Sequence, residues 1–395
     1  MHSTQKLISS VWVLLAMGAV SACGGGGGNS NGGGGLNNPP PPEGITIKQL
    51  DATAGGLRAS ATDPANKYTY FSFSKGDVVE LTDAEAESST EWDIAFKRSE
   101  IKLNGGASGP STVSGALADA QEDFYDGNGK PNASVFLNAD AGIELSALEA
   151  VTDVSALSFA SDRHIPKVIS DGGDDSWWGY NPRAHSVEAA SDNWWLVRSA
   201  EGNSYAKFHV TDIVQATRDI TLELFIQSSD EESFSTIATS YTAAIGAAGG
   251  SKCYDIDTTA EVDCSAGDIW DLKIEVTASG RVWNIWTNGG VSGDGNGEAL
   301  GPLETAEIDT YVSGTTDSAD NDLSAHYHSD ASGGLFVDNS WYAYNVTGNP
   351  RDHLLYPNYR VYAIDTGSAQ YALQIQSYYD NAATGGWYTI RYKEL

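Results

Sequence analysis

The chain has 395 residues, of which 41% are hydrophobic, and its 22 basic residues against 53 acidic ones leave a net charge of −31. This charge repels nucleic acid and anionic lipid surfaces, so it excludes nucleic acid as a partner. The sequence has no HExxH zinc motif and no phosphate-binding P-loop, and no catalytic residue is predicted.

The N-terminal residues predict an exported lipoprotein. Residues 1–22 combine Lys6 with an apolar run that is too short for a comfortable membrane span, which is typical of a signal peptide. Small residues precede Cys23, so we expect cleavage before Cys23 and lipidation of its thiol. Residues 23–45 continue with Gly, Asn and Pro and form a flexible tether. No aspartate follows Cys23, so we expect an outer membrane lipoprotein, on the surface or the periplasmic face.

The rest of the chain contains two copies of one pattern. The motif WWGYN at 177–181 recurs as WYAYN at 341–345, and an Asn-Gly-Gly turn at 104–106 recurs at 288–290. The landmarks keep the same order in both copies, so we predict two repeats, residues 46–228 and 229–395.

Alternation of apolar and polar residues predicts β-strands within each repeat. Residues 67–73, 205–210 and 371–377 alternate and are rich in aromatic and β-branched side chains. Aspartate-glycine turns, such as those at 126–129 and 294–297, fit ordinary turns better than calcium sites. Residues 140–150 are the one segment predicted to form a short helix. The predicted fold is all-β, with two tandem antiparallel modules.

Two cysteines remain after Cys23. Cys253 and Cys264 lie eleven positions apart in a strand-like stretch of an exported protein. We therefore predict a disulfide, because a metal site would need further soft ligands nearby.

Four histidines are the candidate ligands. His164 stands thirteen positions before Trp177, and His328 stands thirteen positions before Trp341. This spacing predicts that the two histidines are equivalent, although His326 is an alternative to His328.

Asn-Pro-Arg motifs precede the other two histidines. The motifs lead to His185 in the first repeat and to His353 in the second. Each repeat thus carries a histidine pair. Histidines that only hydrogen-bond a loop are the structural alternative.

A pair of neutral imidazoles suits the two axial positions of a haem iron. Arg183 and Arg351 lie beside the histidines and could meet haem propionates, as could Arg163 and Lys167. The aromatic residues at 177–180 and 341–344 fit either the surface of a macrocycle or an ordinary core.

Several segments resemble the HmuY haem-binding lipoproteins. The similar residues are YFSF at 70–73, WDIAFKR at 92–98 leading to NGGAS at 104–108, and the closing segment 371–391. The resemblance implies a non-enzymatic, all-β protein of haem and iron acquisition that grips haem b between loops. The duplicated histidine pairs predict one haem per repeat and two per chain. The resemblance implies His164 with His185, and His328 with His353, as axial pairs. A TonB-dependent outer-membrane haem receptor is the implied partner.

Two other functions remain open at this stage. A surface module that binds a glycan or another protein would also be acidic, aromatic-rich and β-built. A glycoside hydrolase needs only a pair of suitably spaced carboxylates, and 53 acidic residues offer many pairs.

Overall fold

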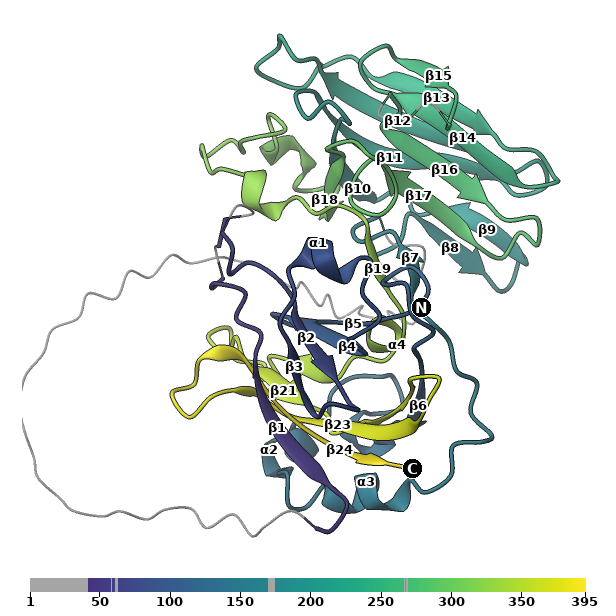
Figure 1. Cartoon of the computed structure of the whole chain (residues 1–395). Helices are drawn as coiled ribbons and strands as arrows, with labels where there is room; N and C mark the ends of the chain where they lie inside the picture. The colour runs from purple at the N-terminus through teal and green to yellow at the C-terminus, as the bar shows by residue number, and fades with distance from the viewer. Residues whose placement is uncertain (1–41, 58, 61–62, 170–174, 266, 268) are drawn as a thin grey trace, which may run out of the picture. The chain divides into compact units, whose positions relative to one another are not determined.

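The computed structural model describes residues 42–57, 59–60, 63–169, 175–265, 267 and 269–395 (Figure 1). The predicted signal peptide, Cys23 and most of the tether lie outside these residues. No helix in the described ranges has the length and apolar character needed to cross a membrane.

One five-stranded sheet and one four-stranded sheet share a core, and we call them module A. The strand orders are β1-β24-β23-β22-β6 and β3-β2-β4-β5, and the pairs are antiparallel. The strands are β1 (Thr46–Asp51), β2 (Thr69–Ser72), β3 (Asp77–Val79), β4 (Ile94–Lys97), β5 (Glu100–Leu103), β6 (Ser114–Asp119), β22 (Val361–Asp365), β23 (Gln370–Tyr379) and β24 (Gly385–Glu394). Buried aromatic side chains from both sheets, including Phe71, Phe96, Tyr362 and Tyr388, form the core.

A second pair of sheets repeats this arrangement, and we call it module B. The strand orders are β13-β12-β11-β10-β18 and β15-β14-β16-β17. The strands are β10 (Asn193–Arg198), β11 (Tyr205–Val214), β12 (Asp219–Gln227), β13 (Thr239–Ala244), β14 (Gly250–Asp255), β15 (Ala260–Val262), β16 (Leu272–Val276), β17 (Trp283–Thr287) and β18 (Glu298–Glu304). Trp195, Phe208 and Trp283 lie in its buried core. The prediction of antiparallel all-β architecture is confirmed.

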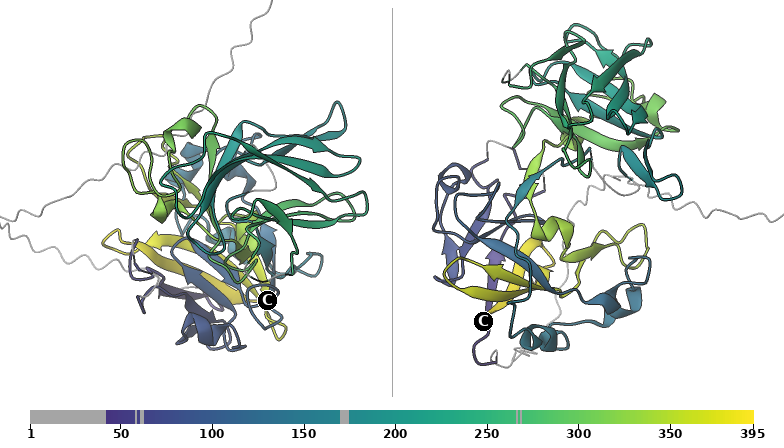
Figure 2. Two further views of the ribbon diagram at one scale, coloured as in Figure 1. Left: turned by 90° about the horizontal axis from the view of Figure 1, so that it is seen from above. Right: turned by 90° about the vertical axis from the view of Figure 1, so that its right-hand side faces the viewer.

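The two sequence repeats exchange their halves. Module A combines β1 to β6 of the first repeat with β22 to β24 of the second, whereas module B combines β10 to β12 of the first repeat with β13 to β18 of the second. In Figures 1 and 2 the yellow C-terminal strands accordingly lie with the purple and blue N-terminal strands. The ranges 46–228 and 229–395 are therefore sequence repeats, and each module is assembled from both of them.

The chain segments that connect the modules meet in a short antiparallel pair. β7 (Arg163–Ile165) pairs with β19 (Ala331–Gly333). The carboxylate of Asp162, just before β7, accepts a hydrogen bond from the amide of Leu103 at 2.9 Å, and Asp330, just before β19, accepts one from Thr287 at 2.9 Å. Burial raises the pKa of both carboxyls, that of Asp330 to about 6. Asp162 and Asp330 thus occupy equivalent positions.

The recurring Asn-Gly-Gly turns pack against these two aspartates. Gly106 has a φ of +64°, and a Cβ there would lie 2.1 Å from the carbonyl oxygen of Asp162. Gly290 has a φ of +61° and the same close approach to Asp330. Only glycine fits such a position, which explains why the motif is present in both repeats.

Short helices and two hairpins complete the fold. The helices are α1 (Asp83–Ala86), α2 (Ala133–Asn138), α3 (Leu145–Ala150), α4 (Leu335–Asp338) and the 3-10 turns η1 (Glu122–Phe124), η2 (Ile308–Thr310) and η3 (Ser324–His326). The hairpins are β8 (Trp178–Asn181) with β9 (Ser186–Ala189), and β20 (Tyr342–Tyr344) with β21 (Leu355–Pro357). The helix predicted at 140–150 is confirmed only over α3, because the Asp140 carboxylate accepts hydrogen bonds from the amides of Gly142 and Ile143 and forms a turn.

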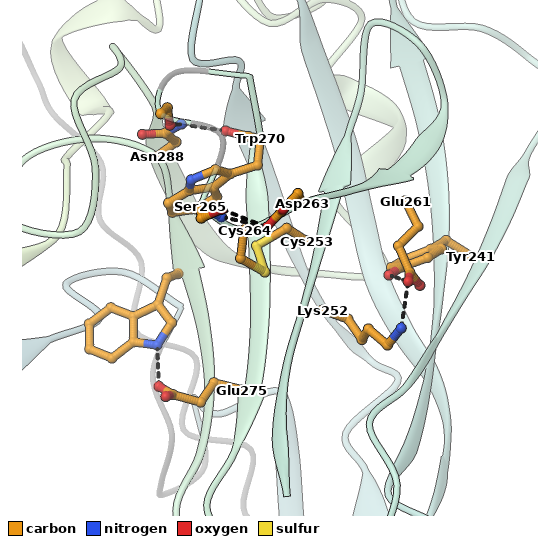
Figure 3. The surroundings of a disulfide bond; sticks show 12 residues. Tyr241, Lys252, Cys253, Glu261, Asp263, Cys264, Ser265, Trp270, Glu275 and Asn288 are labelled. Atoms are coloured by element: carbon orange, nitrogen blue, oxygen red, sulfur yellow. Dashed lines mark hydrogen bonds and ion pairs between the residues drawn. A yellow bond between two sulfur atoms is a disulfide. The ribbon is translucent and has the colours of Figure 1, made fainter.

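The predicted disulfide is present in module B (Figure 3). Cys253 lies in β14 opposite Val262 of β15, and Cys264 follows two residues later. The two Cα atoms are 5.2 Å apart. The bond closes the β14–β15 hairpin beside the buried ring of Trp270.

Candidate functional site

Each hairpin carries a tyrosine that is hydrogen-bonded to a histidine. The hydroxyl of Tyr344 lies 2.5 Å from Nδ1 of His353, and the hydroxyl of Tyr180 lies 3.2 Å from Nδ1 of His185. Both tyrosine side chains are more than half exposed. Tyr344 and His353 are nine positions apart in the sequence, whereas Tyr180 and His185 are only five apart. The same contact therefore forms across loops of different length.

The Asn-Pro-Arg motifs shape the tips of these hairpins. The side-chain oxygen of Asn181 accepts hydrogen bonds from the amides of Arg183 and Ala184, and that of Asn349 accepts one from the amide of Arg351. Such turns explain the recurring asparagine. They leave Arg183 and Arg351 exposed beside the histidines.

His164 and His353 belong to module A. His164 follows Asp162, whose carboxylate is bonded to the amide of Leu103 in β5. The hairpin of His353 is held by the hydroxyl of Tyr379 in β23, which accepts a hydrogen bond from the amide of Leu355 at 2.9 Å.

His185 and His328 belong to module B. His328 exchanges two backbone hydrogen bonds with Ala299 in β18, at 2.9 and 3.0 Å. The hairpin of His185 is joined to module B by the indole N–H of Trp178, which donates to the carbonyl of Trp283. The chain passes from one module to the other between the members of each pair expected from the sequence, and the pairing itself stays a prediction.

The thirteen-residue spacing before Trp177 and Trp341 is not a structural equivalence. His164 is two residues after Asp162, and the same position after Asp330 is Ser332, which pairs directly with His164 in the β7–β19 ladder. His328 forms an isolated β-bridge with Ala299, and Ala160 forms the equivalent bridge with Gly115. The counterpart of His328 in the first repeat is therefore Ala160. The prediction that the two histidines are equivalent is wrong. The second crossover segment, from Asp330 to Trp341, is four residues shorter than the first, from Asp162 to Trp177.

The ring of His328 is suited to bind a metal at neutral pH. Partial desolvation, followed by the nearby ammonium of Lys167, lowers its pKa below the usual value. His328 is therefore unprotonated at neutral pH, the form that a metal requires. His326 lies at the exposed end of η3.

A cavity of about 700 Å³ lies in module A beside the hairpin of His353. Residues 120–131 of the first repeat form one wall, and residues 337–344 with Arg360 of the second repeat form the other. The lining residues include Tyr125, Tyr342 and Tyr344. The hairpin tyrosine that contacts His353 is thus part of the cavity wall.

The charges around the cavity are mixed. The guanidinium of Arg360 lies over the ring of Tyr125 at 5.1 Å and donates to the carbonyls of Ala120 and Ser340. Glu122, Asp126 and Asp338 also line the cavity.

The two cations predicted beside His164 are engaged in ion pairs. Arg163 binds both carboxylate oxygens of Asp338, at 2.8 and 2.9 Å, and Lys167 pairs with Glu100 at 2.7 Å. Neighbouring residues of a strand point to opposite faces, so His164 lies on the face of β7 away from Asp338.

The predicted aromatic clusters divide between core and surface. Trp177 and Trp341 are fully buried, so they belong to the core, whereas Tyr180 and Tyr344 are exposed. Among the described residues, the one group of three side chains close enough to share a metal is Glu201, Asp257 and Asp271, and it contains no histidine.

The cavity wall at residues 120–131 is not among the features predicted from the sequence. Within this wall the Asp126 carboxylate accepts hydrogen bonds from the amides of Asn128 and Lys130, which close the aspartate-glycine turn. The signal that could have found it is Tyr125, which recurs as Tyr311, each following a 3-10 turn.

Residues 65–224 match the HmuY protein family model. None of the curated proteins compared matches the chain. A solved structure of a Bacteroides fragilis protein described as a lipoprotein is 12% identical, with 89% of each chain covered and a TM-score of 0.30. A Bacteroides vulgatus protein described as HmuY-like and haem-binding is 11% identical, with 89% of this chain and 91% of that chain covered and a TM-score of 0.28.

Proposed function

We propose that the chain is a non-enzymatic haem-binding lipoprotein of haem and iron acquisition, and the match of residues 65–224 to the HmuY family model supports this proposal. The proposed ligand is haem b, with one molecule in each module and two per chain. Each site is then served by both sequence repeats.

The cavity of module A carries this proposal. Its volume of about 700 Å³ lies within the range of cofactor sites in proteins, roughly 300 to 1,000 Å³. Its tyrosine rings offer flat apolar surface to a macrocycle. The hairpin beside it presents Tyr344 and His353, and both phenol oxygen and imidazole nitrogen are ligands of haem iron. These two donors support haem as the proposed ligand.

The charges of the wall restrict how carboxylates could bind there. Glu122 and Asp126 repel an anion, whereas Arg360 attracts one. Arg163 neutralises Asp338. We propose Arg360 and the exposed Arg351 as the cations nearest to haem propionates in module A, and Arg183 as the corresponding cation in module B.

The iron ligands are proposed to come from the two hairpins and from one crossover segment. His353 and His164 share module A, and His185 and His328 share module B. We propose that the hairpin of each module would supply one ligand of the iron, and that His328 would supply a second one in module B. His164 lies on the face of β7 away from Asp338, which lines the cavity, so we do not propose it as a ligand in that cavity.

The cellular setting is proposed from the sequence. Lipidation of Cys23 would anchor the protein to the outer membrane, and residues 24–45 would act as the tether. A TonB-dependent outer-membrane haem receptor is the proposed partner.

Titration of the purified mature protein with ferric haem, followed by absorbance, tests the function. The expected result is a shifted Soret band that saturates near two equivalents of haem per chain. A module that binds glycan or protein instead would leave the spectrum of free haem unchanged throughout the titration. That result would reject haem binding.

A further inference from the structure

Of the hydrogen-bonded tyrosine and histidine of the β20–β21 hairpin, the tyrosine is the one that lines the cavity. Tyr344 is among the described residues that line the cavity, whereas His353 is not among them. His353 contacts the hydroxyl of Tyr344 through Nδ1 at 2.5 Å. The order from the cavity outward is therefore tyrosine first and histidine second.

What the imidazole can offer depends on its tautomer, because a proton on Nδ1 would leave Nε2 free to bind a metal. If the hydroxyl of Tyr344 donates to Nδ1, the proton of the neutral imidazole is on Nε2, and neither nitrogen keeps a free lone pair for a metal. A phenol oxygen does keep lone pairs. A free phenol, however, loses its proton only near pH 10, so binding a metal at neutral pH requires a proton acceptor. Nδ1 of His353 is placed to be that acceptor.

We propose that Tyr344, rather than His353, binds the iron of haem in module A, and that His353 positions the tyrosine and takes its proton. This inference rests on the proposed function. The O–H bond of Tyr344 breaks, its oxygen bonds to iron, and the proton moves to Nδ1 of His353. The resulting imidazolium donates back to the phenolate oxygen. The iron stays ferric, so the step needs no oxidant or reductant.

The same assignment applies to Tyr180 and His185 in module B. Their contact has the same atoms, hydroxyl and Nδ1, although the loop between them is four residues shorter. A hydrogen bond that only ties the hairpin together would be the other explanation. The two explanations differ in what removal of the hydroxyl does to a bound haem.

Resonance Raman spectra of the ferric haem complex of the full mature chain test the assignment. The wild type is expected to show iron–phenolate vibrations. Their intensity should fall by about half in Tyr344→Phe and vanish in the double variant with Tyr180→Phe. Tyr342→Phe is the matched control, because Tyr342 lines the same cavity without a histidine partner, and it should keep the wild-type spectrum.

A second variant separates the two roles. His353→Gln should keep the iron–phenolate bands but weaken haem binding by roughly 10- to 100-fold, the usual effect of losing a residue that orients a metal ligand. Because Tyr344 is exposed, Tyr344→Phe should fold like the wild type, which a thermal melt checks.

Three results would count against the inference. If Tyr344→Phe leaves the haem spectrum unchanged while His353→Gln abolishes coordination, His353 is the ligand and the proposed function survives. If the wild type lacks phenolate bands but binds haem, the assignment also fails. If the wild type binds no haem, the proposed function itself fails, and the assignment with it.

Discussion

Exchange of strands between the repeats can be tested with one engineered disulfide. Ser114 of β6 lies directly opposite Asp365 of β22. Opposed residues of antiparallel strands have Cα atoms about 4.5 to 5.5 Å apart, within the range of natural disulfides. The variant Ser114→Cys with Asp365→Cys should therefore oxidise to a bond within one chain.

The expected stabilisation is large because the bond closes a long loop. The chain between the two positions spans roughly 250 residues, and the loss of unfolded-state entropy for such a loop corresponds to about 5 kcal/mol. Engineered bonds usually deliver less, since they strain the native geometry. We expect module A of the oxidised variant to unfold at a higher urea concentration than that of the reduced variant.

Peptide mapping by mass spectrometry under non-reducing conditions is the assay. The matched control is Ser114→Cys with Arg198→Cys, because Arg198 holds in module B the position that Asp365 holds in module A. If each repeat folded on itself, the control pair would be opposed instead. A bond in the control and none in the test pair would refute the exchange.

Three further predictions concern stability and anchoring. Replacing Cys253 and Cys264 together by alanine should lower the free energy of unfolding by about 3 kcal/mol, the value for a loop of this length, and an unchanged urea midpoint would argue against it. Burial raises the pKa of Asp271 to about 7, against about 3.9 in an unfolded chain, so its contribution to stability is present below pH 4 and is lost as the pH rises through 7. Glu201→Gln removes a neighbouring negative charge and should reduce that loss, measured by urea unfolding at pH 5 and pH 8; equal losses in both proteins would contradict this. Cys23→Ser should block incorporation of labelled fatty acid, and label in the variant would disprove lipidation at that residue.

Local features of the fold follow from the sequence because local chemistry determines them. Alternation predicts strands such as β11 and β23, since one face of each packs against a core. The Asn-Gly-Gly turn is recognisable because only glycine tolerates the contact of Gly106 with Asp162. The disulfide is predictable because Cys253 and Cys264 share one hairpin.

The exchange between repeats has no local signal. Both repeats carry equivalent strands in the same order. The sequence pattern that pairs β6 with β22 would therefore equally allow β6 to pair with β10, the equivalent strand of its own repeat. Spacing alone predicts the histidine pairs, and the shorter crossover segment before Trp341 gives His328 the same spacing as His164 without the same position in the fold. The cavity could not be predicted because Tyr125 and Arg360 come together only when the halves of the two repeats meet.

The haem capacity of a variant with a filled cavity tests the central claim most directly. Ala120 lines the cavity of module A, so Ala120→Trp places an indole in the space assigned to haem. Ala382→Trp, in the exposed β23–β24 turn, is the matched control. Ala120→Trp should bind one haem equivalent fewer per chain than the wild type, and Ala382→Trp should keep the wild-type capacity. Unchanged haem capacity in a folded Ala120→Trp protein would contradict haem binding in this cavity.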